Sequence, residues 1–74
     1  MNANLLKGCI VSCGLTVKQV ADKIGIGETT FYRKMNGQSD FYREEISKIC
    51  DILSISDPVP IFFAKQLAET QEKN

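Results

Sequence analysis

Four polar side chains of the kinds that contact nucleic acids follow one another closely: Glu28, Thr29, Tyr32 and Arg33. Their spacing places all four on one face of an α-helix. An arginine guanidinium can form two hydrogen bonds with a guanine edge, and a threonine offers a base its hydroxyl or its methyl group. Tyr32 can contact a base or a phosphate. The same residues are also compatible with an ordinary solvated helix, so the elements around them must decide between the two interpretations.

Residues 16–37 predict a short helix, a tight turn and a second helix. Thr16 is a candidate N-cap. Apolar residues then recur at the spacing of one helix face: Val17, Val20, Ala21 and Ile24. Gly25 ends this helix, because glycine adopts the left-handed conformation at no steric cost.

The second helix carries the four polar residues on its outer side. Its inner side is predicted to consist of Thr30 or Phe31 together with Lys34 and Met35. Asn36-Gly37 closes it as Gly25 closes the first helix. Two short helices joined by a glycine turn form a helix-turn-helix, whose second helix can enter the major groove of DNA.

Several short motifs of this segment occur together in one family of regulators. They are Val20-Ala21 at the helix crossing, Ile24-Gly25-Ile26 at the turn, Phe31, and Asn36-Gly37. The small Ala21 matters there because a larger side chain would push the crossing helices apart. On these residues the chain resembles the XRE, or Cro/CI-type, helix-turn-helix regulators. It is most similar to the small Cro-like proteins of temperate phages, including the antirepressors called modulators of repression. Residues 41–53 and 60–63 extend the resemblance over nearly the whole chain.

The resemblance implies an all-α fold, a single small five-helix domain like that of lambda repressor. We expect this domain to span residues 1–68, with the motif at 16–37 and a polar C-terminal tail at 69–74.

The resemblance also implies which residues contact a ligand. The start of the second helix would contact base edges or a partner protein through Gly27, Glu28, Thr29, Tyr32 and Arg33. Residues placed where the family's backbone follows the DNA strand would bind phosphates: Lys18, Asn36, Gln38, Ser39 and Arg43.

Three residues differ from the family's usual pattern. Val17 stands where a glutamine often contacts DNA, and Glu28 brings a negative charge to the start of the second helix. That charge repels phosphate unless it accepts from a cytosine amino group. Lys34 occupies a usually apolar position, so we expect Met35 to supply the core contact.

The charge balance predicts weak non-specific DNA binding. The chain has nine basic and nine acidic residues and no net charge. Residues 1–50 hold seven Lys or Arg against five Asp or Glu, and the rest holds two against four. Phosphate contacts and counterion release supply most non-specific affinity, so a mildly basic first part permits DNA binding without strongly favouring it.

Two functions from different classes remain open. The first is a regulator in a lysis/lysogeny switch that binds operator DNA, as a homodimer on a pseudo-palindromic site. The second is an antirepressor that binds a CI-type repressor. The neutral charge and Glu28 favour it, as does the apolar run that we expect to contact proteins: Ile61, Phe62 and Phe63.

Helices before and after the motif complete the predicted bundle. Asn4 is expected to cap a helix over about 5–13, with an inward stripe of Leu6, Cys9, Ile10 and Cys13. After Phe41, which plugs the core, a helix over about 42–53 buries Ile46, Ile49, Cys50 and Leu53. Ile55 extends the core, the prolines at 58 and 60 break the helix, and residues 61–67 form a short fifth helix.

Other function classes lack the residues they need. The chain has no histidine and no glycine-rich phosphate loop, and Glu44 and Glu45 point about 100° apart on a helix. We therefore predict no enzyme activity and no cofactor. Three cysteines without a fourth ligand predict small buried thiols rather than a metal site.

Without a signal peptide or a membrane span, the expected location is the cytoplasm, that of the host cell if the chain is phage-encoded.

Overall fold

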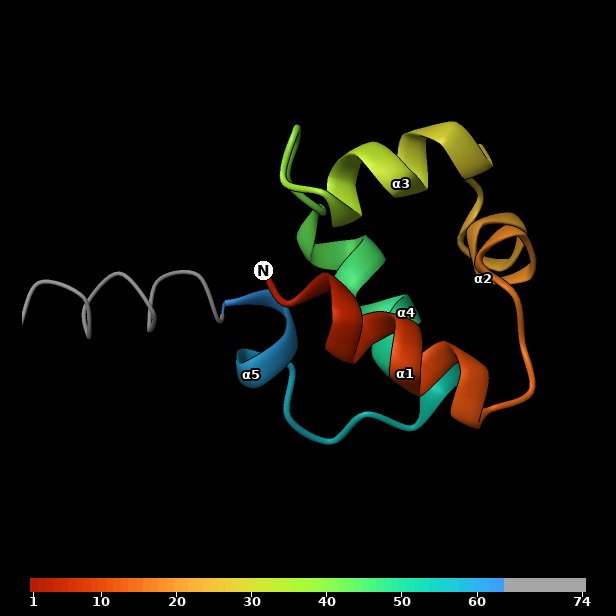
Figure 1. Cartoon of the computed structure of the whole chain (residues 1–74), viewed down its shortest axis with the longest axis vertical. Coiled ribbons are helices and arrows are strands. Elements are labelled where there is room, and N and C mark those ends of the chain that lie inside the picture. Colours follow the sequence, from red (N-terminus) through yellow and green to blue (C-terminus); the bar gives the residue numbers. More distant parts are fainter. Residues whose placement is uncertain (64–74) are drawn as a thin grey trace, which may run out of the picture.

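Five α-helices make up the part of the chain that the computed structural model describes, residues 1–63 (Figure 1). In chain order they are α1 (Ala3–Ser12), α2 (Val17–Ile24), α3 (Glu28–Met35), α4 (Arg43–Leu53) and α5 (Val59–Phe62). Over these residues the chain forms no strand, which confirms the all-α prediction. None of these helices is long and apolar enough to cross a membrane.

The first helix begins earlier than the sequence pattern predicts. Asn2 is the N-cap, and its side-chain oxygen accepts a hydrogen bond from the Leu5 backbone N–H at 3.0 Å. The expectation that Asn4 caps this helix is therefore wrong, because Asn4 already lies inside it. Leu6 and Ile10 face the core and Cys9 is half-buried, but Cys13 lies beyond the last helical residue and is exposed. The prediction that Cys13 faces inward is therefore also wrong, since the helical spacing does not extend beyond Ser12.

The second helix begins and ends where the sequence predicts. The Thr16 hydroxyl accepts from the Gln19 N–H at 3.2 Å, and the Gln19 side chain accepts from the Thr16 N–H at 2.8 Å. This reciprocal capping box satisfies two amide groups that a helix start leaves unpaired. Gly25 ends the helix in the left-handed conformation, with φ of +86°, as expected.

The third helix buries one side against the bundle. Phe31, Lys34 and Met35 are all buried, whereas Thr30 is exposed, so Phe31 is the core residue of the two alternatives. The helix ends at Asn36, and Gly37 follows with φ of +86°. The expectation that Met35 replaces Lys34 as the core contact holds only in part, because both side chains are buried.

The fifth helix differs most from its prediction. The Asp57 carboxylate accepts from the Val59 N–H at 3.0 Å, and the proline at 60 sits in the first turn. Proline is tolerated there because the backbone N–H groups of a first turn have no intrahelical acceptor, so proline, which has no N–H, loses no hydrogen bond. The segment that was expected to break helices therefore starts α5, which runs from Val59 to Phe62 and so begins before residue 61. Residues 64–68, and the tail at 69–74, lie outside the described residues.

A single apolar core joins all five helices. Its buried members are Leu6, Ile10, Val20, Ala21, Ile24, Phe31, Met35, Ile49, Leu53, Ile61 and Phe62. Phe41 packs edge-on between Phe31 and Phe62, with ring centroids 5.2 and 5.6 Å apart. Phe41 thus links α3 to α5 and packs against the core, as the sequence predicts.

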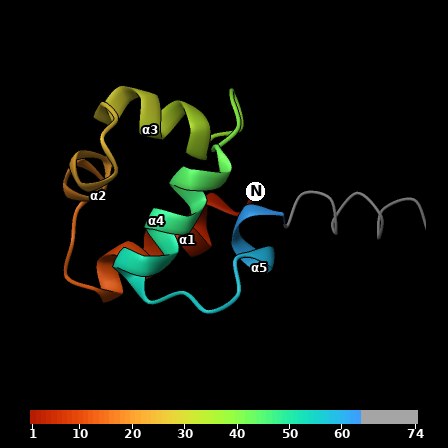
Figure 2. The same ribbon diagram turned by 180° about the vertical axis from the view of Figure 1, so that it is seen from behind.

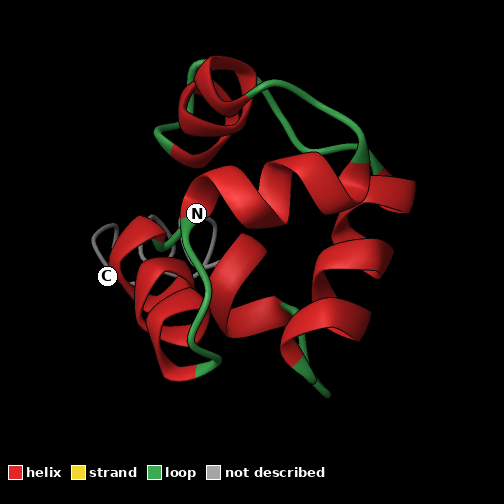
Figure 3. Ribbon diagram, turned by 90° about the vertical axis from the view of Figure 1, so that its right-hand side faces the viewer, coloured by secondary structure: helices red, strands yellow, loops and turns green. Residues whose placement is uncertain are grey.

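The helices are arranged so that α3 lies at one edge of the bundle. α2 packs against both α3 and α4, and α1 packs against α2 and α5. Figure 1 shows α3 along the top and α1 and α4 below it, and the reverse view in Figure 2 confirms the order. Figure 3 shows the same bundle from the side, with loops confined to the helix ends. The Asn2 N–H donates to the Ile61 carbonyl at 2.7 Å, so the N-terminus is held beside α5.

Candidate nucleic-acid interface

The outer face of α3 consists of polar side chains. Its inner side is fixed by the buried Phe31 and Met35, which turns the opposite side toward solvent. Glu28, Thr29, Tyr32 and Arg33 are all exposed on that side, and Gly27 is the N-cap residue just before them. The five residues predicted for base or partner contact thus lie on the exposed side of α3 or just before its first residue, and α3 is the helix along the top of the bundle in Figure 1.

The charges of α3 are ordered along its length. Glu28 lies in the first turn, and Arg33 and Lys34 lie in the last. Both signs stabilise the helix, since the N-terminus carries partial positive charge and the C-terminus partial negative charge. Lys34 is only 7% exposed, so Arg33 is the cation that α3 offers to solvent.

The predicted phosphate-binding residues fall into two groups. Asn36, Gln38 and Ser39 are exposed in the loop after α3, and Arg43 is exposed at the start of α4. The Gln38 N–H donates to the Arg33 carbonyl at 2.9 Å, which ties this loop to the end of α3. Lys18 is exposed on a different helix, near the N-terminus of α2.

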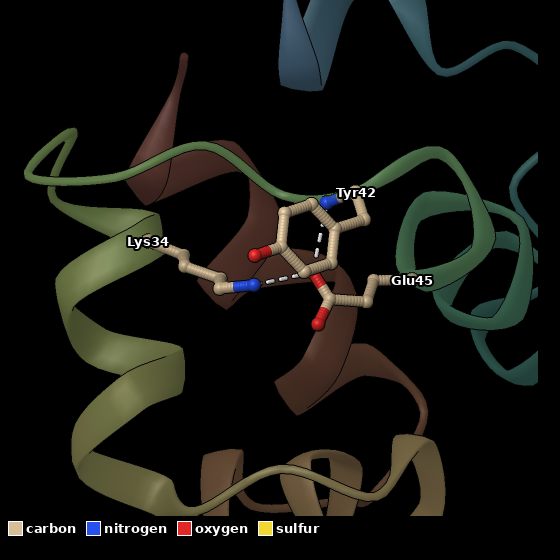
Figure 4. A network of polar contacts seen from close by, with 3 residues as sticks. All are labelled: Lys34, Tyr42 and Glu45. Carbon is tan, nitrogen blue, oxygen red and sulfur yellow. Dashed lines mark hydrogen bonds and ion pairs between the residues drawn. The ribbon is translucent and has the colours of Figure 1, made fainter.

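A buried ion pair connects α3 to α4, and the sequence analysis missed it (Figure 4). The Lys34 ammonium lies 2.7 Å from the Glu45 carboxylate oxygen Oε1. The same oxygen accepts from the Tyr42 backbone N–H at 2.8 Å, and the Tyr42 ring covers the ammonium with its centroid 4.0 Å from Nζ. We call Lys34, Tyr42 and Glu45 the α3–α4 ion-pair network.

A signal for this network is present in the sequence. Lys34 falls on the inner stripe of its helix, and Glu45 falls four residues before the buried Ile49. Two opposite charges on inward stripes of neighbouring helices indicate a buried pair, because an unpaired buried charge is strongly unfavourable.

The apolar run at 61–63 is not the free surface that was expected. Ile61 is 3% exposed and Phe62 is 9% exposed, and both belong to the core. Only Phe63, at 40%, remains accessible. The expectation of an apolar docking segment is therefore wrong for Ile61 and Phe62, because both side chains pack into the core of this small domain.

The three cysteines are free thiols. Cys9 and Cys50 are half-buried, and the exposed Cys13 thiol donates to the Leu53 carbonyl at 3.7 Å. Burial, and to a smaller extent the Asp51 carboxylate, raises the pKa of the Cys50 thiol above its ordinary value. Within residues 1–63, no three His, Cys, Asp or Glu side chains are grouped in a way that could hold a metal ion.

The comparison with protein families agrees with this geometry. A family model described as the Cro/C1-type HTH DNA-binding domain matches residues 12–58, more than half of the chain. The match includes α2, the turn, α3 and α4 entirely. Searches of curated proteins and of solved structures gave no match.

Proposed function

The chain belongs to the family of Cro/C1-type helix-turn-helix DNA-binding domains, and we propose that it is a phage-type regulator of a lysis/lysogeny switch. In this proposal α3 lies in the major groove of an operator. The exposed face of α3 carries the proposal, because its Thr29, Tyr32 and Arg33 offer a hydroxyl, a phenol and a guanidinium to base edges.

The proposed contacts divide between bases and phosphates. Arg33 would form a bidentate pair with a guanine, while Lys18, Arg43 and the loop at 36–39 would hold the DNA backbone. A single domain of this size contacts few base pairs, so two copies on a pseudo-palindromic site are expected. Binding would take place in the cytoplasm, that of the host cell for a phage-encoded protein.

Selection from random DNA tests this function. The purified chain would be mixed with a library of random duplexes, and the retained duplexes sequenced and titrated beside a scrambled control. We expect two related half-sites one helical turn apart and a preference of at least about 10³ over scrambled DNA. Equal affinity for selected and scrambled duplexes would contradict operator binding.

A second function, that of an antirepressor, is favoured by Glu28. This exposed carboxylate begins α3 in a chain without net charge, which suits the basic DNA-binding face of a CI-type repressor better than it suits phosphate. Tyr32, 38% exposed, would add a large contact area next to it. Occupying that face would exclude the repressor's operator by competition.

Mixing experiments distinguish the two functions. If the chain is an antirepressor, it should co-elute with the CI-type repressor encoded beside its own gene at micromolar concentration. Glu28→Lys should weaken this complex and leave or improve binding to bare DNA. Glu44→Lys is the matched control, because Glu44 is also exposed in a first helical turn. Separate elution of the unmodified proteins would end the antirepressor proposal.

A further inference from the structure

The α3–α4 ion-pair network connects the two elements that carry most of the proposed DNA contacts. Lys34 is the residue after Arg33, and Tyr42 is the residue before Arg43. Glu45 holds both ends, since its Oε1 accepts from the Lys34 ammonium and from the Tyr42 N–H. The network therefore contains the sequence neighbours of one proposed base contact, Arg33, and of one proposed phosphate contact, Arg43.

Burying the charges of Lys34 and Glu45 between α3 and α4 costs free energy. Lys34 and Glu45 are 7% and 8% exposed, and removing two charges from water costs free energy that their attraction repays only partly. Helix termini offset some of this cost, because Lys34 is in the last turn of α3 and Glu45 in the first turn of α4. Apolar side chains of similar size would fill the site with equal or greater stability. A directional contact, however, fixes relative position better than an apolar one.

The loop between α3 and α4 does not by itself fix the position of one helix relative to the other, so directional contacts between the two helices matter. Its residues 36–40 are exposed, and α3 and α4 each pack mainly on α2. Phe41 anchors the loop against Phe31, but Arg43 comes two residues later. The Lys34–Glu45 contact spans the gap from the end of α3 to the start of α4 (Figure 4).

We propose that Lys34 and Glu45 are positioning residues for operator recognition. Their ion pair holds the outer face of α3 and the start of α4 in the one relative placement at which Arg33 meets a base edge while Arg43 meets a phosphate. This inference rests on the proposed operator binding. It predicts that loss of the pair lowers discrimination between DNA sequences, while general affinity for DNA and the fold are kept.

The test uses a nearly isosteric double variant, Lys34→Met/Glu45→Gln. Methionine keeps most of the lysine stem, and glutamine keeps an oxygen that can accept from the Tyr42 N–H. The control, Lys7→Met/Asp51→Asn, removes one positive and one negative charge from exposed positions on α1 and α4. Each protein would be titrated with the duplex that the unmodified chain selects from a random library and with a scrambled duplex, after a thermal melt.

We expect the double variant to melt cooperatively at or above the temperature of the unmodified chain. Its preference for the selected duplex should fall about tenfold or more, the loss of one good base contact. Its affinity for scrambled DNA should stay within about twofold, and the control should keep the full preference. Lys34→Arg can still pair with Glu45, so this single variant should keep most of the preference for the selected duplex. If the double variant fails to melt cooperatively, Glu45→Gln alone serves as the second variant, with the same fall expected.

Three results would overturn the proposal, and they differ from one another. A folded variant with undiminished preference would show that the pair has only a structural role, and operator binding would stand. Equal losses on selected and scrambled DNA would show a general effect on affinity. Failure of the unmodified chain to select any duplex would remove operator binding itself, and the positioning role with it.

Discussion

Arg33 and Lys18 are both exposed cations, but their places in the fold predict different effects on DNA binding. Arg33 stands on the outer face of α3, and Lys18 lies near the start of α2. Arg33→Ala should cost about 1–3 kcal/mol at the selected duplex and relax discrimination at one base pair. Lys18→Ala should weaken binding to all sequences alike and reduce the salt slope by about one. Titrations of both variants with selected and scrambled duplexes at several salt concentrations measure this difference. If both variants lose the same affinity on both duplexes, Arg33 does not contact a base.

The three thiols differ in environment, which predicts an order of reactivity. The pKa of Cys50 is raised by burial and by Asp51, so a smaller fraction of this thiol is thiolate at any pH below that value. Because the thiolate is the nucleophile, alkylation of Cys50 should be slower than that of the exposed Cys13, and its rate should rise only at higher pH. Iodoacetamide labelling between pH 7 and 10, followed by peptide mass spectrometry, measures both rates. In denaturant the two rates should converge, and a Cys50 faster than Cys13 in the folded chain would contradict the assigned burial.

At the scale of helices, short-range signals predicted the motif well. Thr16 and Gly25 bound α2 as expected, because a cap and a left-handed glycine act within a few residues of themselves. The cap of α1 was misplaced because Asn2 and Asn4 have the same side chain, and only the tertiary position of the helix start decides between them. The sequence also contains the Thr16–Gln19 capping box in full, three residues apart, as a local pattern.

Contacts between helices were harder to predict, and the candidate site depends on them. The Lys34–Glu45 pair joins residues eleven positions apart through a loop whose path the sequence does not specify. Ile61 and Phe62 were expected to be exposed because their run looked like a surface patch, but α5 packs against α1 and both side chains are buried in the core. The outer face of α3 was predictable, since periodicity alone separates it from Phe31 and Met35.

Two glycines give a matched test of the helix boundaries. Neither Gly8 in α1 nor Gly25 after α2 would bring an added Cβ within 4 Å of another group, but only Gly25 has a positive φ, of +86°. Gly8→Ala should therefore stabilise the fold by about 0.5–1 kcal/mol, since alanine loses less entropy in a helix. Gly25→Ala should destabilise it by about 1–2 kcal/mol through backbone strain. Thermal melts should show shifts of opposite sign, at roughly 4–8 °C per kcal/mol for a domain of this size. Shifts of the same sign would contradict the left-handed turn.

At the scale of the whole molecule, a small core supports every element that would meet DNA. Eleven buried apolar side chains hold the bundle together within residues 1–63. α2 contacts α1, α3 and α4, so the placement of α3 depends on how closely α2 approaches its neighbours. For 74 residues the expected free energy of unfolding is roughly 4–11 kcal/mol. One poorly accommodated core residue can therefore remove a large part of it.

Ala21 is the position where this dependence can be measured. It is fully buried on α2 within the apolar core, and its single methyl lets the helices cross closely. Ala21→Leu adds three carbons to a closed interior, which should cost about 1–3 kcal/mol and lower the melting temperature accordingly. DNA binding should weaken even at temperatures where the variant remains folded, because separating α2 from α3 moves the outer face away from the other contacts. Val11→Leu is the control, since Val11 is 73% exposed and should change stability by less than about 0.5 kcal/mol. Circular dichroism melts and duplex titrations of the two variants give both quantities. An unchanged melt for Ala21→Leu would mean that the helices do not cross at this residue.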